Sequence, residues 1–118
     1  MSSYREALMD LAIQVHQQGD WQIVILAGEV DVATAPRLHD RLVGLASAGH
    51  RRLAVDLDGV TMLDWMGLGA LLGVLARVRS LGGELVLLAP SPATRELLAL
   101  TDLDKVLPIR DELTVSES

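Results

Sequence analysis

The sequence contains no cysteine and no phenylalanine, only one lysine, and 3% aromatic residues. The absence of cysteine excludes disulfide bonds, thiol catalysis and cysteine-ligated metal sites, and it fits a reducing compartment. Basic residues are also few. The net charge is −6 at pH 7, which leaves nothing to neutralise a run of phosphates, so we expect no nucleic-acid partner.

Long hydrophobic runs are missing as well. No apolar segment approaches the ~20 residues needed to cross a bilayer, and residues 1–10 lack the apolar core of a signal peptide. We therefore expect a cytoplasmic protein without direct membrane insertion. What the sequence does have is 50% hydrophobic residues in a chain of 118, which is enough for one domain with a packed core.

Hydrophobic patterns predict strands and helices in alternation. The expected strands are 11–16, 21–28, 53–57, 84–89 and 106–109, the first two joined by a turn at Gly19-Asp20. The expected helices are 34–49 with Thr34 as its cap, 68–82, and 91–100 with Ser91 as its cap. This order predicts an α/β domain over residues 1–110, with a mixed β-sheet, an N-terminal hairpin and helices packed on the sheet. Residues 111–118 form an acidic tail that we expect to be flexible.

The segment DLDG, with Asp56 and Asp58, is similar to the opening motif of haloacid-dehalogenase-type phosphatases, in which an aspartate is the nucleophile. Such an enzyme also needs a lysine and a later acidic pair for magnesium. The chain offers only Lys105 and the pair Asp102/Asp104 for these roles. We favour a simple turn at the Asp-Gly pair and keep the small phosphatase as a remote alternative.

The segment GLGALLG, from Gly67 to Gly73, matches a variant of the dinucleotide-binding glycine pattern. The preceding strand is expected to end near Leu57, and the next strand ends without an acidic residue for a ribose hydroxyl. We therefore expect that Gly69 and Gly73, one turn apart, instead let the helix lie close to the sheet. No cofactor or metal site is expected, since the three histidines share no ligand spacing: His16, His39 and His50.

Asp64 stands just before an expected helix start, where its carboxylate can accept from the N–H group of Met66 or Gly67. Trp65 and Met66 follow it in a chain that is poor in aromatic residues. Both residue types are enriched at protein interfaces, so the pair is either packed in the core or offered to a partner. The sequence leaves these two alternatives open.

Three segments together resemble the STAS family, the fold shared by bacterial anti-sigma factor antagonists and the cytoplasmic domains of sulfate transporters. They are residues 26–42, 53–75 and 82–109. The resemblance covers nearly the whole chain and implies a regulatory protein-binding module rather than an enzyme. In the antagonists the central loop commonly reads Asp-Ser-Ser/Thr-Gly-Leu-Gly. The hydroxyl residue before the first glycine is phosphorylated by a partner that is both anti-sigma factor and serine kinase.

Carried over residue by residue, the resemblance implies a partner-binding site made of Asp31, Asp64, Trp65, Met66, Gly67, Leu68 and Gly69. Met66 falls on the phosphorylation position, and a thioether cannot accept a phosphoryl group, so no phosphorylation is expected there. Thr61 is the nearest hydroxyl, but we expect it to be packed in the preceding segment, which makes it a poor substitute.

The function expected from these observations is docking on an anti-sigma factor or serine-kinase-like regulatory protein, without control by phosphorylation at residue 66. The alternative is a structural subunit of a larger assembly, such as a lipid-transport ABC complex or a stress-sensing scaffold. The sequence does not fix the oligomeric state, and a homodimer is one option.

Overall fold

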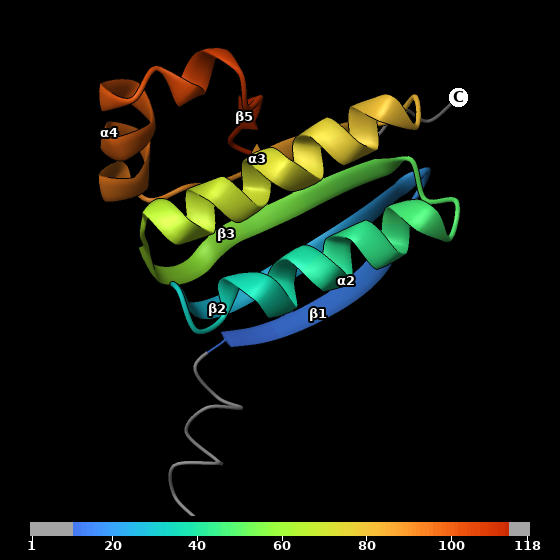
Figure 1. Cartoon of the computed structure of the whole chain (residues 1–118), viewed down its shortest axis with the longest axis horizontal. Coiled ribbons are helices and arrows are strands. Elements are labelled where there is room, and N and C mark those ends of the chain that lie inside the picture. The colour runs from blue at the N-terminus through green and yellow to red at the C-terminus, as the bar shows by residue number, and fades with distance from the viewer. Residues whose placement is uncertain (1–10, 114–118) are drawn as a thin grey trace, which may run out of the picture.

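A five-stranded sheet carries two long helices across one face, with a shorter helix at one end (Figure 1). The computed structural model describes residues 11–113. The strands are β1 (Leu11–Gln18), β2 (Trp21–Val30), β3 (Arg52–Leu63), β4 (Glu84–Leu88) and β5 (Ile109–Arg110). The helical elements are α2 (Ala35–Ser47), α3 (Trp65–Ser80), α4 (Pro92–Leu100) and the 3-10 turn η1 (Leu103–Lys105).

The strands follow one another across the sheet in the order β1-β2-β3-β4-β5. β1 and β2 form an antiparallel hairpin, and the remaining neighbours pair in parallel. Gly19 has a φ of 62°, the left-handed conformation that a tight hairpin turn requires. The predicted α/β fold, with its mixed sheet and N-terminal hairpin, is confirmed. Because β2, β3 and β4 are parallel, the starts of α2, α3 and α4 gather at one end of the sheet.

Alternation along the strands produces two apolar clusters. On β3, Leu53 and Val55 face the buried residues of α2 and α3, while Ala54 points to the opposite face. The opposite cluster consists of Trp21, Ile23, Ala54, Val86 and Leu88. Both faces of the central strands are therefore apolar, as expected for parallel strands that are buried on each side.

β3 is longer than the sequence predicts. It continues through Asp58 and Gly59 to Leu63, so the expected turn at the Asp-Gly pair is wrong. The pairing with β2 shifts register twice along this stretch, and Gly59 comes so close to β2 that a Cβ there would lie 2.8 Å from the Leu26 carbonyl oxygen. Bulges thus absorb the turn-like residues within a continuous strand. As a result, α3 begins at Trp65, directly after β3, rather than at Leu68.

Three smaller expectations meet different outcomes. The Thr34 hydroxyl does not cap α2, because it accepts from the Asp31 N–H at 3.0 Å and donates to the Glu29 carbonyl oxygen at 2.8 Å. The strand expected at 106–109 is reduced to Ile109–Arg110, because η1 and the residues after it take up the preceding chain. The Ser91 cap of α4 is confirmed, since its hydroxyl accepts from the Thr94 N–H.

The tail expected from residue 111 on lies outside the described residues from 114 onward. Within the described part, Asp111 forms an ion pair with Arg95, and Leu113 packs against the Trp21 cluster. Among residues 11–113, no helix has both the length and the apolar character that a membrane crossing demands.

Candidate functional site

The start of α3 is built around the carboxylate of Asp64. Its Oδ1 accepts from the backbone N–H groups of Met66 at 2.9 Å and Gly67 at 3.1 Å. The Asp64 N–H in turn donates to the Val30 carbonyl oxygen at the end of β2. The predicted cap is therefore confirmed, and it fixes the first turn of α3 against the end of the sheet.

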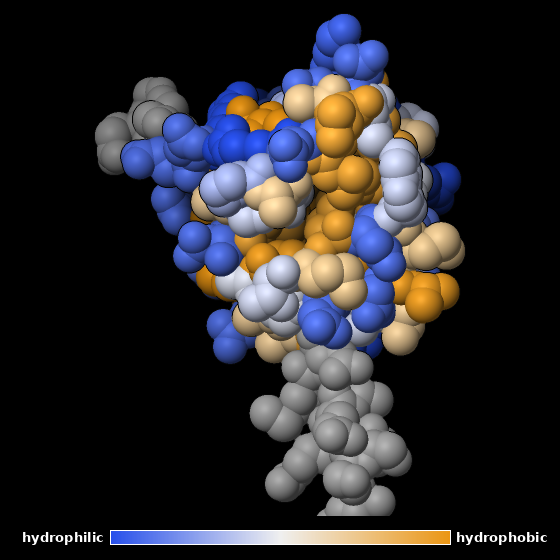
Figure 2. Space-filling view, turned by 90° about the vertical axis from the view of Figure 1, so that its left-hand side faces the viewer, coloured by the Kyte–Doolittle hydropathy of each residue, from blue (hydrophilic) through white to orange (hydrophobic). Residues whose placement is uncertain are grey.

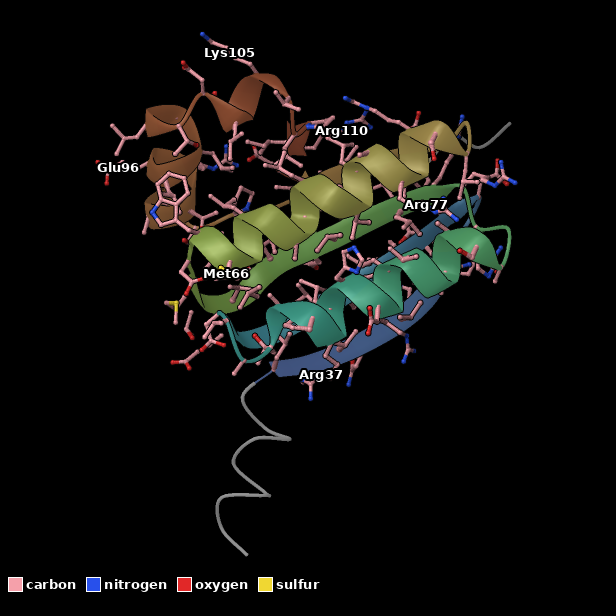
Figure 3. The ribbon with its side chains drawn as sticks, viewed as in Figure 1. Arg37, Met66, Arg77, Glu96, Lys105 and Arg110 are labelled. Carbon is pink, nitrogen blue, oxygen red and sulfur yellow. The ribbon has the colours of Figure 1, made fainter. Side chains whose placement is uncertain are left out.

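Trp65 and Met66 project from this first turn into solvent. Trp65 is 65% exposed and Met66 is 54% exposed, so the core alternative is excluded for both side chains. Figure 3 labels Met66 at the end of the molecule where α3 begins. A hydrophobic side chain gains nothing from such a position in the free protein. This exposed pair makes the end of the sheet the strongest candidate for a binding site.

Two apolar grooves flank Trp65. The first, of about 270 Å³, lies between α2 and α3 and is lined by Ala35, Pro36, His39, Trp65, Met66, Gly69 and Ala70. The second, of about 440 Å³, lies between α3 and the α4–η1 segment and is lined by Trp65, Leu68, Gly69, Leu72, Leu100, Thr101 and Leu103. We call the two grooves with Trp65, Met66 and Leu100 the Trp65 surface. Figure 2 faces this end of the molecule and shows hydrophobic surface running across it.

Leu100 is a member of this surface that reasoning from the sequence missed. It lies at the end of α4 and is 79% exposed, the highest value among the large hydrophobic residues described. The run LLAL at positions 97–100 offered a signal, because it carries more leucines than one face of a short helix can bury. Two further exposed apolar side chains are Val32, in the turn after β2, and Met62, near the end of β3.

The glycines of α3 have different roles from those expected. A Cβ on Gly67 would lie 2.6 Å from Val30 Cγ1 and 2.9 Å from the Val30 carbonyl oxygen, so Gly67 is the residue that lets α3 approach the sheet. A Cβ on Gly69 would meet nothing within 4 Å, and Gly73 faces His39 on α2. The expectation that Gly69 and Gly73 provide the close approach to the sheet is therefore wrong.

Leu68 is fully buried beside Gly67, so these two residues support the surface from below. Asp31 lies in the turn between β2 and α2, where its Oδ1 accepts from the N–H groups of Ala33 and Thr34. Asp31 directly follows Val30, whose carbonyl oxygen holds Asp64. The two acidic turns are thus fixed next to each other at the ends of adjacent strands.

Thr61 is exposed on β3 rather than packed, contrary to expectation. Its hydroxyl donates to the Gly28 carbonyl oxygen at 3.2 Å. A strand residue held in this way cannot take the place of a residue in the first turn of α3.

The residues of the phosphatase alternative do not come together. Asp56 and Asp58 line a pocket with His16, Leu88 and the segment after β5, but neither Lys105 nor the pair Asp102/Asp104 takes part in it. Lys105 instead pairs with Asp102 at 3.4 Å on η1. Asp56 Oδ1 accepts from the Asp58 N–H, which is a role within the bulged strand.

Comparison with known proteins identifies the family of the chain. Residues 12–115 match the STAS domain family. The chain is 30% identical over 103 residues to the anti-sigma-B factor antagonist of Staphylococcus aureus, covering 87% of this chain and 95% of that protein. The crystal structure of an anti-sigma factor antagonist from Mycobacterium paratuberculosis is similar at 30% identity and a TM-score of 0.76, over 87% of each chain.

The fold is also that of the anti-sigma factor antagonist SpoIIAA in its unphosphorylated form. The TM-score is 0.68 at 19% identity, over 86% of this chain and 90% of that one. The family match spans most of the sequence, and the relatives are covered over nearly their full length. The chain belongs to the STAS domain family, and it is similar over most of its length to proteins named as anti-sigma factor antagonists.

Proposed function

We propose that this protein docks its Trp65 surface, together with Asp31 and Asp64, on an anti-sigma factor. The observation that carries the proposal is the exposed Trp65–Met66 pair, held at a capped helix start between two apolar grooves. Tryptophan is one of the residue types that are enriched at the energetic hot spots of protein interfaces. The relatives named as anti-sigma factor antagonists support the identity of the partner.

The role of each site residue follows from its position. Trp65, Met66 and Leu100 supply apolar contact area, and the partner fills the grooves beside the indole. Asp64 fixes the first turn, while Gly67 and Leu68 hold that turn on the sheet from below. Binding would bury apolar surface that is costly to leave in water, at roughly 25 cal/mol for each Å² removed.

Phosphorylation at residue 66 is not available to this protein. The Met66 side chain ends in a thioether and offers no oxygen for transfer. A phosphate at such a helix start would add about −1.5 to −2 charges to an apolar surface and weaken binding through desolvation and repulsion. We infer that the complex is controlled by the amounts of the two proteins, or through the partner, and not by a charge added at this position.

The first experiment measures binding of the full chain to an anti-sigma factor of the serine-kinase class from the same organism by calorimetry. We expect Trp65→Ala to weaken the complex by more than ~1 kcal/mol. Val106→Ala is the matched control, because Val106 is also an exposed apolar residue but lines neither groove. Equal affinities of both folded variants and the wild type would contradict the proposed surface.

A second experiment restores the hydroxyl. With the same partner and ATP, Met66→Ser is expected to gain one phosphoryl group on Ser Oγ, detected by mass spectrometry, while the wild type gains none at this residue. The first turn of α3 in the wild type, residues 65–68, contains no hydroxyl group that could accept a phosphoryl group. If the wild type instead copurifies with a membrane ATPase and binds no anti-sigma factor, the chain is a subunit of an assembly.

A further inference from the structure

The two edges of the sheet are protected to very different degrees. β5 closes one edge with only two residues. Among residues 11–113, β1 forms the other edge with eight residues, LAIQVHQQ, and its ladder to β2 runs without a register shift. Natural sheets guard their edges with short strands, charged residues, proline or bulges. β5 is short, whereas β1 is long and regular, and none of its own eight residues is proline, lysine, arginine, aspartate or glutamate.

The hairpin determines which backbone groups of β1 face outward. Gln18 and Trp21 flank a two-residue turn, so they exchange hydrogen bonds and the backbone of Gln18 faces β2. Alternation then turns the backbone of Gln17, Val15 and Ile13 toward the outer edge. Leu11 supports this alternation independently. Its carbonyl oxygen faces outward, because it accepts from Arg37 on α2 instead of from β2.

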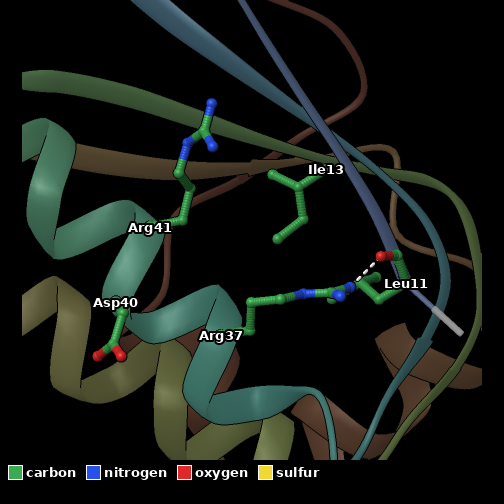
Figure 4. Close-up of a pocket in the computed structure, with 5 residues that line it drawn as sticks. All are labelled: Leu11, Ile13, Arg37, Asp40 and Arg41. Carbon is green, nitrogen blue, oxygen red and sulfur yellow. Dashed lines mark hydrogen bonds between the residues drawn. The ribbon is translucent and has the colours of Figure 1, made fainter. Parts of the chain in front are cut away.

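The surroundings of this edge suit a neutral strand. A groove of about 480 Å³ runs between β1 and α2 and is lined by Leu11, Ile13, Arg37, Asp40 and Arg41 (Figure 4). Arg37 donates a hydrogen bond to the Leu11 carbonyl oxygen, so this group is already paired. The other outward-facing residues are Ile13, Val15 and Gln17, whose N–H and C=O groups both point away from β2. None of the three carries a charge. Another uncharged strand can therefore approach without like-charge repulsion.

We infer that β1 pairs antiparallel with β1 of a second copy of this chain. A twofold axis that pairs all three outward residues with those of the copy must pass beside the middle one. Val15 therefore lies opposite Val15 of the copy, and Ile13 lies opposite Gln17. The Gln17 amide then reaches the groove that Arg41 lines, where a neutral oxygen is a suitable acceptor for a guanidinium. The pairing joins two five-stranded sheets into one continuous sheet. It shares no residue with the grooves of the Trp65 surface.

Sedimentation of the full chain over a range of concentrations tests this interface. The wild type is expected to form dimers as concentration rises. Val15→Pro removes the outward N–H but none of the bonds to β2, and proline is tolerated at such edge positions. We expect it to weaken dimerisation by about tenfold or more, since each copy loses a hydrogen bond at the twofold axis. Val15→Ala is the matched control, because it shortens the same side chain and keeps the N–H.

Amide exchange followed by NMR provides a test that needs no variant. Exchange at Ile13, Val15 and Gln17 should slow as the concentration of the wild type rises, while Gln14 and His16, whose N–H groups face β2, stay protected throughout. A wild type that remains monomeric at millimolar concentration overturns the inference. So does a dimer in which the exchange of the three outward amides does not depend on concentration. Neither result bears on binding of an anti-sigma factor at the Trp65 surface.

Discussion

The two tryptophans of the chain lie in opposite environments. Trp21 begins β2, is 6% exposed, and packs with Ile23, Ala54, Val86 and Leu88 on the sheet face away from α2 and α3. Trp65 begins α3 and is 65% exposed between two grooves. The Arg52 guanidinium lies over the Trp21 ring, 5.7 Å from its centroid. One indole is therefore part of the packed structure, and the other presents its area to solvent, where we propose that a partner binds.

The largest expected difference between the two tryptophans is in how much their replacement lowers the free energy of unfolding. Trp21→Ala is expected to lower it by about 3–5 kcal/mol, because a large side chain leaves a cavity in a packed cluster. Trp65→Ala is expected to change it by less than about 1 kcal/mol, because most of its surface is already in water. Urea unfolding followed by circular dichroism measures both variants without depending on tryptophan fluorescence. Equal losses in the two variants would contradict the division of roles.

Much of this architecture follows from the sequence. Strand and helix order, the hairpin turn and the Asp64 and Ser91 caps depend on local signals, namely apolar spacing and capping oxygens, and these predictions are confirmed. The length of β3 does not follow, because Asp58 and Gly59 are turn residues by type. Only their pairing with β2 turns them into bulges. Tertiary pairing overrides local preference there.

The candidate site was predictable in position but not in orientation. Asp64, Trp65 and Met66 are adjacent in the chain, so their grouping needed no structure. Whether Trp65 points inward depends on the helix phase, which is set by the start of α3 at residue 65. Leu100 is far away in the sequence and reaches the same surface only because α4 and η1 pack together beside the first turns of α3.

The next largest expected effect is a difference in stability between substitutions at two glycines that lie two residues apart in α3. Gly67→Ala is expected to destabilise the fold by about 1–3 kcal/mol, because the new Cβ would lie 2.6 Å from Val30 Cγ1 and 2.9 Å from the Val30 carbonyl oxygen. Gly69→Ala meets nothing within 4 Å and is expected to stabilise the helix by about 0.5–1 kcal/mol. Thermal unfolding of the two variants should thus shift in opposite directions. Shifts of the same sign would mean that Gly67 is not the point of close approach.

The smallest expected effect separates the cap from the charge of Asp64. Asp64→Ala removes the acceptor for the Met66 and Gly67 N–H groups and is expected to cost about 1 kcal/mol of stability. Asp64→Asn keeps an oxygen at the same position and should cost only a few tenths, since asparagine caps helices about as well as aspartate. Comparing the two variants by urea unfolding isolates the cap. Because Asp64→Asn preserves the first turn that orients Trp65, any loss of partner affinity in this variant reports the negative charge itself. Unchanged affinity would leave Asp64 with a purely structural role beneath the exposed indole.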